Sequence, residues 1–180
     1  MIHRVGIAAA ATLLVASACG TPKPKTETER TVVDRARGAR YVVPEGWRAY
    51  EGEIRSPAGS LLTLRVYDLL EADKRFVAGL PETLVPQLRE WAEYYYIMDG
   101  APSRMEARVG GLIAMRLEYP IRVRHRDPPS KVTYWVVTRK TRLFVLRAAY
   151  PAVGLAVDEP VMRKVVDGWA FLEDVGGPAG

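Results

Sequence analysis

The clearest structural pattern of the chain is the stretch Ile113-Ala114-Met115-Arg116-Leu117-Glu118-Tyr119-Pro120-Ile121-Arg122-Val123-Arg124, in which apolar and other residues alternate along the whole length. Side chains of a β-strand point alternately to opposite faces of the sheet. The pattern therefore predicts a long strand with one face buried and the other in water. Proline lacks a backbone N–H, so Pro120 predicts a sheet edge or a bulge at that position.

Further strands are predicted after and before this stretch. Segments 132–138 and 143–150 are rich in apolar and β-branched residues and flank a charged turn at 139–142. The residues Met105, Ala107 and Val109 alternate before Gly110-Gly111, a dipeptide typical of tight hairpins.

The amino-terminal half predicts three more strands, at 40–43, 47–55 and 61–69. Turns at 44–46 and 56–59 separate them, and both contain proline and glycine. In the third strand, Leu62, Leu64 and Val66 share one face, and Thr63, Arg65 and Tyr67 share the other.

Two helices complete the predicted domain. The first has Thr83 as its N-cap and Pro86 in its first turn, and it ends at Asp99-Gly100. The second is capped by Asp158 and has Pro160 in its first turn. The predicted apolar stripes are Leu84, Leu88, Trp91 and Tyr95 on the first helix, and Met162, Val165, Val166, Trp169 and Leu172 on the second. The segment 68–78 is compatible with a short helix. The fold class is therefore α+β, an antiparallel β-sheet with helices packed against it.

The amino terminus has the layout of an export signal. A basic start and a short apolar run lead to Ala16-Ser17-Ala18-Cys19-Gly20, which resembles a bacterial lipobox. The run is too short for a membrane-spanning helix, which needs about 20 apolar residues. We therefore predict a lipoprotein signal peptide at 1–18 and a covalent lipid, such as palmitate, on Cys19, the only cysteine of the chain. A plain signal-peptidase site at 16–18 is the alternative.

Removal of this signal divides the chain into a tether and one domain. Residues 19–39 are polar and predict a lipidated flexible linker, 40–175 form a single α+β domain, and 176–180 form a disordered tail. The anchor places the domain outside the cytoplasm. In a Gram-negative cell, Gly20 after the cysteine favours the outer membrane facing the periplasm. In a single-membrane bacterium the same anchor holds the domain on the outer face of the plasma membrane.

The segment Tyr41-Val42-Val43-Pro44-Glu45-Gly46-Trp47 resembles the opening strand and turn of Mog1/PsbP-like domains. The order of hairpins and the closing helix over 161–171 are also similar to that fold, as in DcrB-type and LpqN-type bacterial lipoproteins. The resemblance extends over most of 40–172. It implies a binding, assembly or chaperone-like module of the cell envelope, and it implies no reaction.

Most enzyme classes lack the residues they need. After signal removal His125 is the only histidine, so neither a zinc site nor any other metal centre is predicted. No serine lies in a G-x-S-x-G motif, and no phosphate-binding loop occurs. We therefore predict no catalytic residues and no cofactor. A carboxylate-dependent envelope glycan hydrolase stays open, because such enzymes need only two acids.

The formal charge of +5 suggests nucleic acid as a partner, but export and interleaved acids argue against it. Two candidate contact surfaces emerge. One is an arginine patch for an anion or a partner, formed by Arg116, Arg122, Arg124, His125 and Arg126. The other is an aromatic contact surface at Tyr94 and Tyr96. The predicted function is a membrane-tethered, non-catalytic binding, assembly or accessory module for an envelope protein or an anionic envelope component. A purely structural envelope lipoprotein is the remaining alternative.

Overall fold

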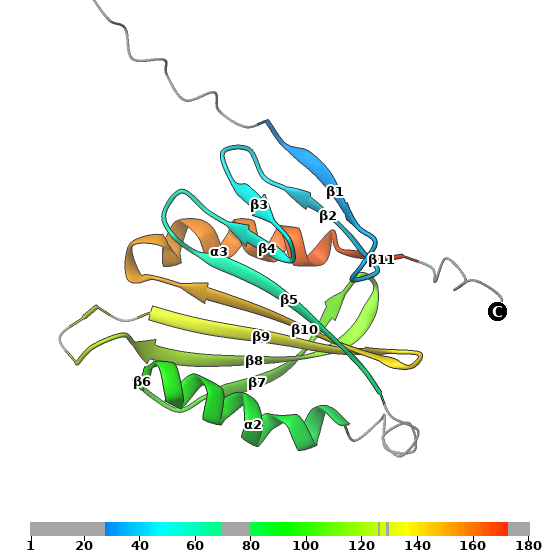
Figure 1. Cartoon of the computed structure of the whole chain (residues 1–180). Helices are drawn as coiled ribbons and strands as arrows, with labels where there is room; N and C mark the ends of the chain where they lie inside the picture. The colour runs from blue at the N-terminus through cyan, green and yellow to red at the C-terminus, as the bar shows by residue number, and fades with distance from the viewer. Residues whose placement is uncertain (1–27, 70–79, 126, 129, 173–180) are drawn as a thin grey trace, which may run out of the picture.

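The computed structural model describes residues 28–69, 80–125, 127–128 and 130–172, which form two antiparallel sheets and two helices (Figure 1). The helices are α2 (Leu80–Tyr95) and α3 (Ala152–Asp167). The strands are β1 (Arg30–Asp34), β2 (Ala39–Val43), β3 (Arg48–Tyr50), β4 (Glu53–Arg55), β5 (Leu61–Asp68), β6 (Ile97–Met98), β7 (Ser103–Val109), β8 (Leu112–Arg122), β9 (Ser130–Arg139), β10 (Arg142–Tyr150) and β11 (Ala170–Phe171). The small sheet has the order β1-β2-β11. The large sheet runs β3-β4-β5-β10-β9-β8-β6, and β7 also pairs with β8.

The large sheet is covered by a helix on each face. Consecutive residues of β10 alternate between two hydrophobic clusters, with Phe144 and Leu146 in one and Leu143 and Val145 in the other. The first cluster includes Met162 of α3, and the second includes Leu88 of α2. Helix α3 also contacts β2 of the small sheet. The structure confirms the predicted α+β class.

Strand β8 corrects the prediction that one of its faces lies in water. Met115, Leu117, Tyr119 and Ile121 are buried in the α2 cluster, as the alternation predicted. The opposite face lies under α3, and Arg116 on it is only 9% exposed. The sequence pattern of β8 does not contain this information, because α3 lies far along the chain. At the ends of the stretch, Ile113 and Val123 are exposed.

The sheet edge or bulge predicted at Pro120 corresponds to a local gap in the pairing of β8. The N–H and C=O of one strand residue point toward the same neighbouring strand. The Pro120 carbonyl accepts a hydrogen bond from Asp99 N at 2.9 Å. The N–H that proline lacks would therefore point to the same side of β8. On that side the chain leaves the sheet between β6 and β7, where β8 has no paired residue opposite Pro120. Thus β8 is an interior strand that behaves as an edge at this one position.

The small sheet lies partly in the segment predicted as a linker. Strand β1 pairs with β2 from Arg30↔Val43 to Asp34↔Ala39, so the ordered domain begins about ten residues before the predicted boundary at 40. The predicted strand 47–55 is also wrong, because the chain turns at Glu51-Gly52 and forms the hairpin β3–β4. Gly52 has φ 68°, a left-handed backbone that glycine adopts without a Cβ clash.

The other predicted strands and turns are confirmed. Gly110 and Gly111 join β7 to β8 with φ values of 56° and 79°, the two positive values that a type I′ hairpin turn requires. A Cβ on Gly110 would lie 2.8 Å from the Trp169 carbonyl oxygen, whereas Gly111 has open space around that position. Strands β9 and β10 form the hairpin predicted around 139–142.

The two helices differ from their predictions in extent and in buried face. Helix α2 begins at Leu80 and ends at Tyr95, and β6 follows in place of its predicted last turn. Helix α3 begins at Ala152 and contains Pro160 in its interior. Asp158 is therefore a buried side chain of its middle, not its N-cap.

Two aromatic positions of the predicted helix stripes lie elsewhere. On α2 the buried positions are Leu88 and Ala92, with Tyr96 just beyond the helix packed beside them, whereas Tyr95 is 66% exposed. Trp169 lies after α3 and stacks on Tyr41 of β2, with ring centroids 4.6 Å apart. The predicted helix at 68–78 lies outside the described residues, apart from its first two positions.

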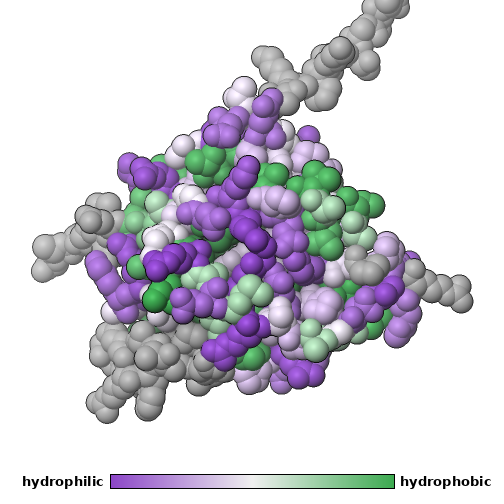
Figure 2. Space-filling model, turned by 180° about the vertical axis from the view of Figure 1, so that it is seen from behind, coloured by the Kyte–Doolittle hydropathy of each residue, from purple (hydrophilic) through white to green (hydrophobic). Residues whose placement is uncertain are grey.

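In the described part of the chain, neither helix is long and apolar enough to cross a membrane. Seen from the side opposite to that of Figure 1, the surface is mainly hydrophilic, with hydrophobic residues gathered in separate patches between hydrophilic ones (Figure 2).

Candidate functional site

A groove lies on the α2 side of the large sheet, beside the helix. Its floor comes from β4, β5, β9 and β10, and its wall comes from the carboxyl-terminal part of α2 and Tyr96 just after it. The cavity has a volume of about 430 Å³, within the range of small-molecule sites. We call it the aromatic groove; it is lined by Glu53, Leu61, Thr63, Arg65, Trp91, Tyr95, Tyr96, Tyr134, Val145 and Arg147.

The strand register sets the floor of the aromatic groove. Glu53 pairs with Thr63, Thr63 pairs with Arg147, and Arg147 pairs with Tyr134. Directly paired residues of neighbouring strands point to the same face of the sheet. The four side chains therefore form one row across β4, β5, β10 and β9, and the two charged members of the row are separated by a threonine.

Arg147 is the central charge of the groove. It is half-buried, and its Nη2 donates a hydrogen bond to the Tyr96 hydroxyl at 2.5 Å. Its guanidinium carbon also lies 5.7 Å from the centroid of the Tyr96 ring. Within the described residues no carboxylate pairs with Arg147. A guanidinium has five N–H donors, so donors remain to bind an anion entering the groove.

Tyr134 lies beneath the groove and is 2% exposed. Burial raises the pKa of its hydroxyl above the usual value, because the ionised form loses hydration, while the charge of Arg147 acts in the opposite direction. Tyr134 is therefore a neutral phenol at physiological pH. It cannot serve Arg147 as a counter-ion.

Two further charged side chains line the groove. Arg65 on β5 is exposed, and Glu53 on β4 is half-buried. In the described ranges, neither side chain belongs to an ion pair or a side-chain hydrogen bond. A larger hollow of about 810 Å³ lies between β1 and β3. There Asp34 already pairs with Arg37 at 3.0 Å.

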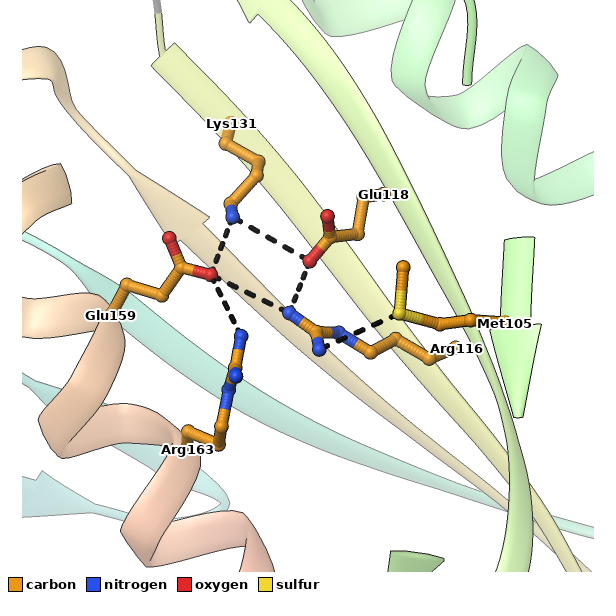
Figure 3. A network of polar contacts seen from close by, with 6 residues as sticks. All are labelled: Met105, Arg116, Glu118, Lys131, Glu159 and Arg163. Carbon is orange, nitrogen blue, oxygen red and sulfur yellow. Dashed lines mark hydrogen bonds and ion pairs between the residues drawn. The ribbon is translucent and has the colours of Figure 1, made fainter. Parts of the chain in front are cut away.

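The structure divides the predicted arginine patch. Arg116 is buried under α3, where it pairs with Glu118 and, at 3.4 Å, with Glu159 of α3 (Figure 3). Its guanidinium carbon also lies 5.7 Å from the ring centroid of Trp135. Arg116 is therefore an interior residue that joins sheet to helix, and it is not part of a docking surface.

The same network includes two more cations. Lys131 of β9 lies 2.5 Å from Glu159 and 3.5 Å from Glu118, and Arg163 lies 3.3 Å from Glu159 (Figure 3). These contacts tie α3 to β8 and β9.

The rest of the predicted patch lies at the far end of β8. Arg122 pairs with Asp99 at 2.7 Å and donates to the Asp127 carbonyl at 2.8 Å. The Asp99 carboxylate raises the pKa of Arg122, chiefly by accepting its hydrogen bond. Arg124 and His125 are exposed, and Arg126 lies outside the described residues. Partner binding at this loop stays a prediction.

The predicted aromatic surface is also divided. Tyr94 is 81% exposed, and its ring contacts Tyr95 edge-on. Tyr96 is half-buried and lies in the aromatic groove. The sequence did not lead us to predict Arg147 as a site residue. It is nevertheless the only charged residue in the apolar run 143–150, and this isolated charge is a signal that could have identified it.

The buried carboxylate of α3 has a structural partner. Asp158 is 3% exposed, and its Oδ2 accepts a hydrogen bond from Ser56 Oγ at 2.5 Å. Ser56 Oγ in turn accepts a hydrogen bond from the Ser60 backbone N–H. A Cβ on Gly154 would lie 2.8 Å from Asp158 Oδ2, so this contact needs glycine. Within the described ranges, no group of three or more histidine, cysteine or acidic residues is placed to hold a metal ion.

Comparison with solved structures identifies the fold. The solution structure of cyanobacterial PsbP (CyanoP) from Synechocystis matches with a TM-score of 0.52 at 12% identity, covering 87% of this chain and 98% of that one. A crystal structure from Bacteroides thetaiotaomicron matches with a TM-score of 0.51 at 11% identity, covering 83% of this chain and 50% of that one. The chain therefore has a PsbP-like α+β fold, as the resemblance at 41–47 implied. No family model matches the sequence, and neither does any curated protein.

Proposed function

We propose that this chain is a membrane-tethered, extracytoplasmic, non-catalytic binding module that recruits an anionic envelope component or partner through the aromatic groove. The observation that carries the proposal is Arg147, a half-buried cation whose side-chain hydrogen-bond partner is a phenol. A cation held in a partly desolvated site without a counter-ion favours binding of an anion. The PsbP-like fold supports a binding or accessory role and says nothing about the ligand.

The tether is the second part of the proposal, and it rests on the sequence, since Cys19 lies outside the described residues. A lipid on Cys19 would confine the domain near the bilayer and raise its effective concentration for partners there. Metabolic labelling with a palmitate analogue tests this point. We expect label on the native chain and none on Cys19→Ala, and equal labelling of both would refute lipidation.

The recruiting surface is tested by affinity capture from detergent-solubilised membranes with three forms of the full chain. These are the wild type, a groove variant with Arg65→Met and Arg147→Met, and a loop variant with Arg122, Arg124 and Arg126 changed to Ser. We expect a partner that is lost from the groove variant and kept by the loop variant. The reverse result would move the binding surface to the loop, and identical capture by all three would argue against both surfaces.

The absence of catalysis is supported by the contacts of three acids in the described part of the chain. Cationic side chains pair with Glu118 and Glu159, and a serine donates a hydrogen bond to Asp158. These contacts link α3 to the rest of the fold. For a glycan hydrolase we would expect two acids facing one cleft. Incubation with purified envelope glycan should release no reducing ends. Release that disappears in Glu118→Gln or Glu159→Gln would favour the hydrolase.

A further inference from the structure

The aromatic groove carries a negative charge as well as its two arginines, and this restricts its ligand. Glu53 and Arg147 belong to the same cross-strand row, separated by Thr63 on the strand between them. In the described residues Glu53 has no ion-pair partner, although two arginines line the same cavity. Opposite charges that share a groove without pairing leave both available to a ligand that carries both signs.

The spacing of the row suits a short peptide. Neighbouring strands lie about 4.8 Å apart, so the backbones at Glu53 and Arg147 are separated by roughly 10 Å. Two extended residues span at most about 7 Å, which leaves room for the charged ends of a dipeptide to meet one side chain each.

The wall of the groove offers a surface for an apolar side chain. Trp91 and Tyr95 project from the last turns of α2, and both are partly exposed, at 39% and 66%. Leu61 and Val145 on the floor are apolar as well. An aromatic side chain packed between wall and floor would bury apolar area and add ring contacts.

We propose that the aromatic groove binds a short zwitterionic peptide. Its ammonium group lies at Glu53, its carboxylate lies at Arg147 and Arg65, and its apolar side chain packs against Trp91. This inference rests on the proposed function, since it specifies the ligand of the same groove.

Calorimetric titration of the full chain in detergent tests whether the groove binds such a peptide. The probes are alanyl-phenylalanine, its N-acetyl derivative without the ammonium, and its C-terminal amide without the carboxylate. We expect the free dipeptide to bind about ten- to a hundredfold more tightly than either derivative, because each loses one charge-assisted contact.

Variants of the groove residues test which side chain binds each end of the peptide. Glu53→Gln should weaken the free dipeptide about tenfold or more and leave the N-acetyl derivative unchanged. Arg65→Met and Arg147→Met should each weaken the binding of the free dipeptide and of the N-acetyl derivative, and leave the binding of the amide unchanged. Within the described residues Arg65 forms no side-chain hydrogen bond or ion pair, so its variant keeps the test valid even where Arg147→Met alters the fold. Glu45→Gln and Arg124→Met, at exposed positions away from the groove, are the matched controls.

Two results would overturn the inference in different ways. If the N-acetyl derivative binds as tightly as the free dipeptide and Glu53→Gln changes nothing, the ligand is an anion without an ammonium group. The zwitterionic ligand is then wrong, while the proposed anion-binding groove stands. If none of the three probes binds, or if binding is unchanged in Arg65→Met and Arg147→Met alike, the zwitterion fails, and the groove itself loses its support.

Discussion

Glu159 joins α3 to the large sheet through ion pairs, and Glu159→Gln tests how much these pairs contribute. Its carboxylate lies 2.5 Å from Lys131, 3.4 Å from Arg116 and 3.3 Å from Arg163. The pair with Arg163 contributes little, because that side chain is 51% exposed and solvent screens such pairs. The other two pairs are with side chains only 18% and 11% exposed.

The expected loss follows from those two contacts. A hydrogen bond to a charged group contributes about 1.5–3 kcal/mol to stability. Glutamine can keep one weaker, neutral hydrogen bond, but Lys131 and Arg116 each lose one of their carboxylate partners. We therefore expect the free energy of unfolding to fall by about 2–3 kcal/mol. In a domain of this size that corresponds to a fall in Tm of roughly 4–12 °C.

Urea unfolding followed by tryptophan fluorescence measures this loss. Glu93→Gln is the matched control, because Glu93 pairs with Arg89 at 2.7 Å across an exposed turn of α2. The same substitution there should leave the unfolding midpoint unchanged. If both variants lower stability equally, or if Glu159→Gln is neutral, the network does not hold α3 on the sheet.

Three further predictions concern packing, backbone and pH. Leu88→Ala should cost about 2–5 kcal/mol in urea unfolding because Leu88 is fully buried, whereas Trp91→Ala should cost much less; equal losses would refute the assigned face of α2. Gly110→Ala should lower Tm more than Gly111→Ala, because both have positive φ but only the first places a methyl group against a carbonyl; the reverse order would refute the hairpin geometry. Burial raises the pKa of Tyr150, so the folded state keeps this proton at a pH where the unfolded chain loses it. Stability should therefore fall as pH rises above about 10, and a flat profile of unfolding free energy to pH 11 would contradict this.

Much of the sheet could be predicted from the sequence because strand signals are local. Alternation at 113–121, the glycine pair at 110–111 and the Pro-Glu-Gly turn at 44–46 depend on neighbours within a few residues. Their elements are found where expected. The hairpin β3–β4 was missed because its strands have three residues each, too few to establish a period of two.

The buried face of α2 shows where local information ends. A stripe through Trp91 and Tyr95 and one through Ala92 and Tyr96 fit the helical period equally well, since both begin with Leu84 and Leu88. Only the position of the sheet selects between them, and it buries the smaller alanine. The larger aromatic side chains stay exposed and form the wall of a groove.

Local pattern and chain order were enough to predict the α+β class and most strand positions. They also predict a lipid on Cys19, which stays a prediction. Which charged side chains meet depends instead on how distant segments pack. Arg116 is drawn beneath α3 to the acid of a helix more than forty residues away. Arg147 shares one face with Glu53 only because β10 pairs with β5, and β5 with β4. Pairing partners come from register and packing between distant segments, and no local pattern records them.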